Sequence, residues 1–324
     1  MKQLDFIIIG AQKSATTSVH RYLQRHPDVV VPQEKEVPFF SWDSMYEAGW
    51  SEFSRRHFAR ADREQLWGTA TPQYMMDPLV PARIRQAVPE VRLIALLRDP
   101  IERAYSHYTM MRRRGYETRE FSAAIEALLQ PEALDRARRE RPPGADGLAS
   151  SPEAYSEAAY YVAWGEYGRI LSQFLVHFPP HQLLIQFAEA YRTAPGESFA
   201  TLLSFIGADA NTLPDNLGEV YHKGQTRTLV PSAWRQSLRR QPWFRAGWDR
   251  LPQGMRARIG YWYDQLNEGQ RRAHRSAKTE QNGLAPIDAY TRARLIDHYR
   301  TDITTLETVT GCPVPWGTLR RGAE

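Results

Sequence analysis

The chain has 324 residues, of which 42% are hydrophobic, so it is long enough to bury one large core or two modest ones. A formal net charge of +5 is small for this length and indicates a local site for a polyanion rather than a surface that coats nucleic acid. The single cysteine, Cys312, excludes an internal disulfide and a cysteine-based metal cluster. No apolar run approaches the roughly 18 residues of a membrane span, and no signal peptide precedes the first strand, so we expect a soluble cytoplasmic protein.

The first predicted element is a short strand at residues 6–9, an unbroken apolar run of the kind buried in a parallel sheet. Gly10 permits a sharp turn, and a predicted helix follows over residues 17–25 and ends before Pro27. The loop between them is small and rich in hydroxyls, with Ser14, Ala15, Thr16, Thr17 and Ser18. Free N–H groups and the positive end of the helix dipole meet in such a loop, so it predicts an anion site to which Lys13 adds a full charge.

The spacing of this loop separates it from that of nucleoside triphosphatases, which place Gly-Lys-Ser/Thr at the helix start with the hydroxyl on magnesium. Here the lysine comes three residues after Gly10, and no metal ligand is evident. The segment resembles the 5′-phosphosulfate loop of sulfotransferases that use 3′-phosphoadenosine 5′-phosphosulfate (PAPS). The resemblance implies that Lys13 and residues 14–18 bind the bridging region of the donor. An ordinary strand and helix cap is the alternative for this stretch taken alone.

Residues 32–42 bring two acids, a lysine and three aromatic residues into one predicted loop. Sulfuryl transfer to an alcohol needs a base for the hydroxyl proton and a cation for the charge that builds on the leaving phosphate. The loop resembles the Glu-Val-x-Phe-Phe segment of heparan-type sulfotransferases and their bacterial relatives, which implies that Glu36 is the general base and Lys13 the cation. Pro38 departs from the sugar enzymes, which often have histidine there. A solvated loop acid is the alternative for Glu36.

A charged, predicted helix over residues 51–66 leads into residues 66–74. The second stretch resembles a Gly-Glu-Lys-Ser/Thr-Pro-x-Tyr segment that lines the acceptor side of the family's cleft. Thr69 and Ala70 replace its acid and lysine, so the charged pair that would touch an acidic sugar is missing. The acceptor class is a hydroxyl of a small molecule, a glycan or a lipid-linked alcohol. The missing charged pair favours a small molecule or a lipid-linked alcohol over a heparan chain.

A second clear strand at residues 91–97 ends at Arg98, and a predicted helix follows. Arg98 and Ser106, two helical turns later, can reach one anion at the edge where open α/β sheets bind ligands. The run 97–106 resembles the family's 3′-phosphate motif, which implies that both residues bind that phosphate. A surface Arg-Asp pair is the alternative without the resemblance. His107, on the same helix, is the second candidate for the base.

Residues 112–156 are rich in Arg, Glu, Pro and Gly, with an amphipathic patch at 121–129. A charge run of this kind is usually a solvated face, and a tip at 142–151 is predicted to be exposed and disordered. If the resemblance holds, the insertion overhangs the donor site and is a candidate lid.

The second half of the chain predicts a helix at 160–178, a strand at 183–187 and a helix at 197–206. Phe187, at the end of the strand, is either a core aromatic or, as the resemblance implies, a ring that stacks on adenine. A later loop suits a clamp on phosphate and resembles the family's Lys-Gly loop at the 3′-phosphate, through Lys223, Gly224 and Arg227.

Residues 230–285 form a helical, aromatic and arginine-rich subregion, which is either packed or rests on a membrane surface as a peripheral contact. A last amphipathic helix, packed onto the sheet, is predicted over residues 295–316.

The resemblance covers nearly the whole chain, which is identified as a bacterial member of the PAPS-dependent sulfotransferase family. It implies a single domain over residues 1–324 with an α/β, P-loop-like three-layer fold, in which helices flank a central, mainly parallel sheet. PAPS is then the donor and adenosine 3′,5′-bisphosphate (PAP) the product, with no metal and no nucleic acid partner, in natural product biosynthesis. A kinase-like phosphoryl transferase and a non-catalytic nucleotide-binding module are the alternatives.

Overall fold

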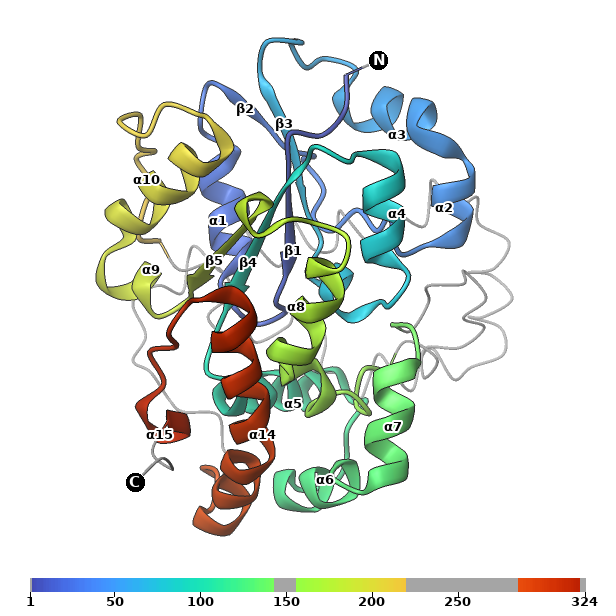
Figure 1. Cartoon of the computed structure of the whole chain (residues 1–324), viewed down its shortest axis with the longest axis vertical. Coiled ribbons are helices and arrows are strands. Elements are labelled where there is room, and N and C mark those ends of the chain that lie inside the picture. Colours follow the sequence, from blue (N-terminus) through green and yellow to red (C-terminus); the bar gives the residue numbers. More distant parts are fainter. Residues whose placement is uncertain (1, 143–155, 220–284, 321–324) are drawn as a thin grey trace. The chain divides into compact units, whose positions relative to one another are not determined.

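The computed structural model describes residues 2–142, 156–219 and 285–320 (Figure 1). The chain divides into two compact units. The first contains Met1–Tyr108, Arg119–Tyr221 and Ile287–Glu324, and the second contains Thr109–Thr118 and His222–Pro286. The predicted phosphate loop with Lys223, Gly224 and Arg227, and all but residue 285 of the predicted subregion 230–285, lie outside the described residues. A single domain over residues 1–324 stays a prediction.

The first unit is built on a parallel sheet that has five strands within the described residues, in the order β2-β3-β1-β4-β5. The strands are β1 (Phe6–Gly10), β2 (Val29–Val30), β3 (Leu66–Ala70), β4 (Arg92–Leu97) and β5 (Leu183–Phe187). The central strand β1 has β3 on one side and β4 on the other, so the loops that leave the carboxyl ends of β1 and β4 meet at one edge. Open α/β sheets bind ligands at that edge. The predicted α/β class with a central parallel sheet is confirmed.

Helices cover both faces of this sheet, which explains the unbroken apolar sequence of β1. Phe6 and Ile8 pack in one core cluster with residues of α1 (Thr16–Leu23) and α10 (Pro195–Ile206). Figure 1 shows α1 and α10 on one side of the sheet, with α4 and α8 on the other. All five residues of β1 are buried, as expected for a strand between two helical layers. The other elements are α2 (Asp43–Glu47), α3 (Gly49–Phe58), η1 (Pro72–Met76), α4 (Val80–Ala87), α5 (Pro100–Arg114), α6 (Phe121–Leu128), α7 (Pro131–Arg139), η3 (Ala163–Gly165), α8 (Tyr167–Leu175), η4 (Pro180–Gln182), α9 (Ala190–Thr193), α14 (Ala289–Thr310) and α15 (Gly317–Arg320).

Three predicted helices have the wrong length. The helix predicted over 51–66 ends at Phe58, where the backbone turns and Ala61 N–H bonds to the Phe58 carbonyl. The helix predicted over 160–178 starts only at Tyr167, because buried aromatic residues and the short 3₁₀ turn η3, which contains Trp164, precede it. The last helix ends at Thr310, where Gly311 adopts a left-handed φ of 64°.

The insertion 112–156 is more ordered at its start than its composition predicts. Residues 121–128 form α6, as the amphipathic patch indicates, and α7 follows with Leu134 and Ala137 buried. Most of the predicted exposed tip lies outside the described residues. Among the described helices, none is long and apolar enough to cross a membrane.

Helix α14 packs along α8 rather than directly on the sheet, and Gly168 permits the close approach. A Cβ at this position would lie 2.2 Å from the backbone oxygen of Asp302 on α14. The Asp302 carboxylate accepts hydrogen bonds from the N–H groups of Gly168 (2.9 Å) and Arg169 (2.8 Å) and so caps α8. Burial raises the pKa of Asp302 to about 6.

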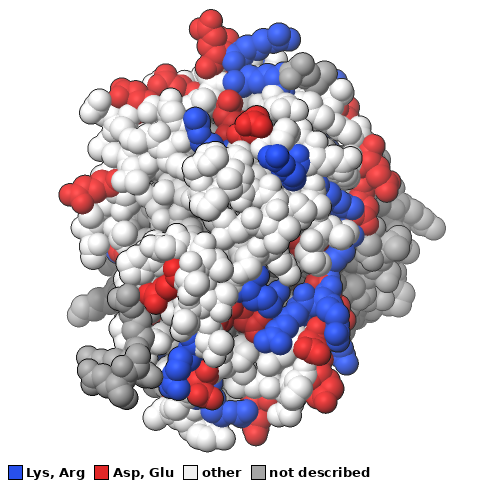
Figure 2. All heavy atoms as spheres, in the orientation of Figure 1, with Lys and Arg blue, Asp and Glu red and all other residues white. Residues whose placement is uncertain are grey.

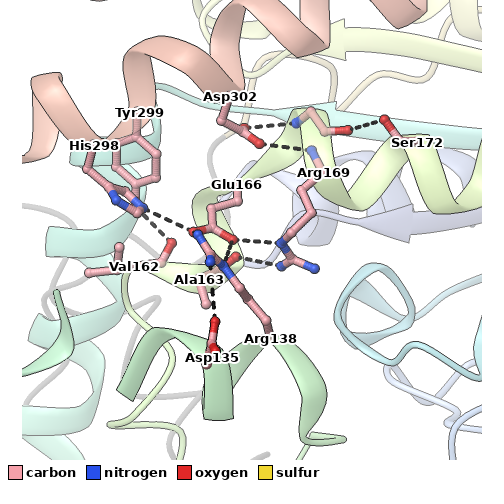
Figure 3. Close-up of polar contacts among 11 residues, drawn as sticks. Asp135, Arg138, Val162, Ala163, Glu166, Arg169, Ser172, His298, Tyr299 and Asp302 are labelled. Carbon is pink, nitrogen blue, oxygen red and sulfur yellow. Dashed lines mark hydrogen bonds and ion pairs between the residues drawn. The ribbon is translucent and has the colours of Figure 1, made fainter. Parts of the chain in front are cut away.

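A second contact between these elements is the buried carboxylate of Glu166, which Figure 3 shows among three basic side chains. It accepts from Arg138 of α7 (2.7 Å), Arg169 of α8 (2.6 Å) and His298 of α14 (3.1 Å). Burial alone would raise the pKa of Glu166, but the hydrogen bonds of His298 and Arg138 and the charge of Arg169 hold it at about 2. The side chain is only 3% exposed, so Glu166 joins three helices through one desolvated charge.

Glu166→Gln is expected to lower the free energy of unfolding by about 2–3 kcal/mol at pH 7, because two guanidinium groups lose their buried counter-ion. The folded pKa of about 2 lies below the value of about 4.3 in an unfolded chain. The stabilisation is therefore complete above about pH 5 and is lost as the pH falls toward 2.

Urea unfolding of both proteins at pH 7, and at the lowest pH at which the wild type stays folded, measures this difference. Glu132→Gln, which changes an exposed acid at the start of α7, is the matched control. A difference between wild type and Glu166→Gln that stays the same at both pH values would contradict the assignment.

Candidate active site

The loop between β1 and α1 has the backbone geometry of an anion site. Lys13 and Ala15 both adopt left-handed conformations, with φ of 73° and 64°. Such strain in residues other than glycine concentrates at ligand sites. Ala15 is the N-cap of α1 and offers no side-chain hydrogen bond, so the N–H groups of the first turn have no capping acceptor from that position. The predicted loop and the predicted helix start are thus found together.

Arg98 meets this loop from the end of the neighbouring strand. The Ala11 N–H donates to the Leu96 carbonyl (2.7 Å), and Arg98 Nη1 lies 3.5 Å from the carbonyl oxygen of Lys13. The Tyr167 hydroxyl donates to the Arg98 carbonyl (3.0 Å). Ser106 follows on α5 and is partly exposed. Arg98 therefore lies beside the predicted 5′-phosphosulfate loop. Its guanidinium is a cation close to the carboxyl ends of both β1 and β4.

The loop that contains Glu36 is fixed by the segment after β3. The hydroxyls of Thr71 (2.8 Å) and Tyr74 (2.7 Å) both donate to the carbonyl oxygen of Val37. Phe39 and Phe40 are buried, and their rings pack edge to face. The Glu36 side chain itself is 33% exposed, as a base that must meet an acceptor requires.

Lys35 connects this loop to α1, a contact that the sequence interpretation missed. Its Nζ lies 3.2 Å from Thr16 Oγ1, 3.3 Å from Thr17 Oγ1 and 3.4 Å from Glu36 Oε1. The structure thus brings Glu36 to the loop hydroxyls through a lysine. A signal was available, because lysine is rare in this chain and Lys35 precedes the predicted base directly.

A buried pair, His107 and Glu157, contacts the loop at Gln12. Glu157 Oε2 accepts from Gln12 (2.7 Å) and lies 3.0 Å from His107 Nε2. The imidazole is fully buried and stacks on Trp164. Burial lowers the pKa of His107 to about 4, although Glu157 opposes the shift. His107 thus contacts the loop through Glu157 and is 0% exposed, so Glu36 is the more accessible of the two candidate bases.

Phe187 lies at the carboxyl end of β5, paired in register with Leu97. Its ring contacts Trp316 edge to face, with 5.4 Å between centroids. Phe187 can still be either a core aromatic, because its ring packs on Trp316, or a ring that stacks on adenine, because it pairs in the sheet with the residue before Arg98. The remaining predicted donor contacts, Lys223, Gly224 and Arg227, are outside the described residues.

The charges visible on one face of the molecule are mixed. Figure 2 shows Lys and Arg side chains interspersed with Asp and Glu, without a continuous basic field.

The comparison with known families agrees with this geometry. A family model described as "Sulfotransferase domain" matches residues 3–277, most of the chain. The chain belongs to this family. Among curated relatives, "Membrane-associated sulfotransferase kil1" of Dictyostelium discoideum is 37% identical over 107 residues, which are 32% of this chain and 22% of the relative. "Heparan sulfate glucosamine 3-O-sulfotransferase 3B1" of Homo sapiens is 30% identical over 207 residues, 64% of this chain and 47% of the relative.

The chain therefore spans less than half the length of those two relatives. A crystal structure of a sulfotransferase from Alicyclobacillus acidocaldarius superposes with a TM-score of 0.63 at 20% identity and covers 99% of this chain and 100% of its own. That likeness supports the fold. The resemblance stated from the sequence motifs is confirmed at the level of the family.

Proposed function

We propose that the protein transfers the sulfuryl group of PAPS to the hydroxyl of a small-molecule, glycan or lipid-linked acceptor, with PAP as the second product. The observation that supports this most directly is the meeting of three features at one loop. The start of α1 has no side-chain cap and can accept an anion, Arg98 lies beside it, and Glu36 is linked to it through Lys35.

The residues present fit a donor with two separate anionic ends. Lys13 and residues 14–18 would hold the 5′-phosphosulfate, because backbone N–H groups and hydroxyls gather there. Arg98 and Ser106 would hold the 3′-phosphate, with further contacts from Lys223, Gly224 and Arg227. Phe187 would lie near the adenine. No metal ligand belongs to this assignment.

The chemistry assigned to these residues is a direct transfer. As the acceptor oxygen forms its bond to sulfur, the bond from sulfur to the leaving phosphate oxygen breaks, and the acceptor proton passes to the Glu36 carboxylate. The departing PAP phosphate gains negative charge, which the Lys13 ammonium stabilises. Buried His107 does not enter this scheme, since its Nε2 is already engaged by Glu157.

Two residues at the end of β3 limit the chemical class of the acceptor. Thr69 and Ala70 stand where the sugar enzymes have an acid and a lysine, and both are buried. The acceptor side of this site therefore lacks a charged pair at these positions, which favours a small or lipid-linked alcohol. A cytoplasmic setting, peripheral membrane contact and a role in natural product biosynthesis stay predictions from the sequence.

Calorimetry with PAP and with ATP tests the donor class. PAP is expected to bind at least about tenfold more tightly, because ATP lacks the 3′-phosphate that Arg98 would contact. Radiolabelled PAPS and a panel of hydroxylated metabolites then test transfer. Tighter binding of magnesium ATP would favour a kinase-like transferase, and PAP binding without transfer to any alcohol would favour a nucleotide-binding module.

A further inference from the structure

The ammonium group of Lys35 lies in an unusual place for a loop lysine. Its side chain is only 12% exposed, and its three N–H groups meet Thr16, Thr17 and Glu36. Burial lowers the pKa of Lys35, while the charge of Glu36 opposes that shift. His20 of α1 also faces it and stays neutral, because burial and then the charge of Lys35 lower the pKa of His20 to about 3.

The charge of Lys35 is only weakly compensated. Among the described residues Glu36 is the one carboxylate in contact with it, and the 3.4 Å separation is longer than the 2.7–2.9 Å typical of a strong charge-assisted bond. That carboxylate is also partly exposed to water. A partly desolvated cation with so weak a partner favours a second anion nearby.

The two threonine hydroxyls show where that anion would lie. A hydroxyl has one proton to donate and accepts through its lone pairs. Because Thr16 and Thr17 accept from Lys35, their own protons must point elsewhere, and neither hydroxyl donates to an acceptor among the described residues. Thr16 is buried and its oxygen already accepts from Lys35, so a phosphosulfate oxygen beside it would supply the acceptor that its proton lacks among the described residues.

We propose that Lys35 is a donor-recognition residue, which fixes the hydroxyls of Thr16 and Thr17 as hydrogen-bond donors to the 5′-phosphosulfate and adds its own charge to that end. This rests on the proposed function. Lys35 acts through the two threonines and is in that sense a positioning residue. It is tied to the base, since the same ammonium contacts Glu36.

Three nucleotides, PAP, adenosine 5′-phosphate and adenosine 3′-phosphate, carry both phosphates or only one of them, so they report on the two ends of the donor site individually. Their binding can be measured without an acceptor. Lys35→Met is expected to weaken PAP and adenosine 5′-phosphate about tenfold while adenosine 3′-phosphate binds unchanged. Lys35→Arg should restore most of the lost affinity, because it keeps the charge. Glu34→Gln, an exposed acid in the same loop, is the matched control and should leave all three affinities unchanged.

A double-mutant cycle tests the role of the threonines. If Lys35 acts through Thr17, then Lys35→Met should cost clearly less in a Thr17→Val background than in the wild type. If Lys35→Met weakens all three nucleotides equally, or leaves the affinity for PAP unchanged, the proposed role of Lys35 is wrong. PAP binding by the wild type would in that case still support the proposed donor. If the wild type binds none of the three nucleotides, the proposed donor is wrong, and the role of Lys35 is wrong with it.

Discussion

Glu36→Gln is expected to reduce turnover by roughly 10²–10⁴-fold at saturating substrates, the usual contribution of a positioned general base. The amide keeps the size of the side chain, and its oxygen can still accept from Lys35, which lies 3.4 Å away in the wild type. Donor affinity should therefore stay within about threefold of the wild type. Steady-state rates with labelled PAPS, together with calorimetry of PAP, measure the two effects separately.

Lys13→Ala is the variant with which Glu36→Gln should be compared, because it is expected to affect donor binding as well as turnover. The lysine would touch the donor in the ground state and the leaving phosphate in the transition state, so both affinity and turnover should fall. Near-normal turnover by Glu36→Gln would remove Glu36 from the role of base. The buried position of His107 means that another exposed group would then have to take that role.

Arg98→Ala is expected to weaken PAP binding by about 1.5–3 kcal/mol, on the order of 10- to 150-fold, since it removes a charge-assisted contact to the 3′-phosphate. The loss should be seen for adenosine 3′-phosphate and not for adenosine 5′-phosphate, the reverse of the result expected for Lys35→Met. Calorimetry on the folded variant measures it.

Arg56→Ala is the matched control for this variant, because Arg56 is an exposed cation on α3, away from the loop. The thermal midpoint of each protein shows whether the fold is retained. An unchanged dissociation constant for PAP in folded Arg98→Ala would contradict the 3′-phosphate assignment.

The sheet and the donor side of the site could be predicted because their signals are local. A four-residue apolar run, a hydroxyl-rich turn and an arginine at a strand end each indicate their structure within about ten residues, and β1, α1 and β4 lie where these patterns place them. The parallel sheet follows from runs buried on both faces.

The contacts that hold the site together were not predictable in the same way, because they join residues far apart in the chain. Gln12 and Glu157 are separated by 145 positions, and Tyr167 reaches the Arg98 carbonyl across 69. The sequence around Glu157 and around Tyr167 has no local pattern that distinguishes these residues from an ordinary polar or core side chain. The start of α8 was misjudged for the same reason, since tertiary packing of buried aromatic residues decides it.

Left-handed backbone at Lys13 and Ala15 restricts which substitutions the loop can accept during evolution. A β-branched side chain is strongly disfavoured at a φ near +60°, whereas glycine and asparagine adopt that conformation readily. Position 15 is therefore free to drift only among small or turn-forming residues. In the proposed mechanism Lys13 is limited twice, because its left-handed backbone favours glycine or asparagine while the leaving phosphate would need the lysine charge. Relief of strain and retention of activity thus select opposite changes at this one residue.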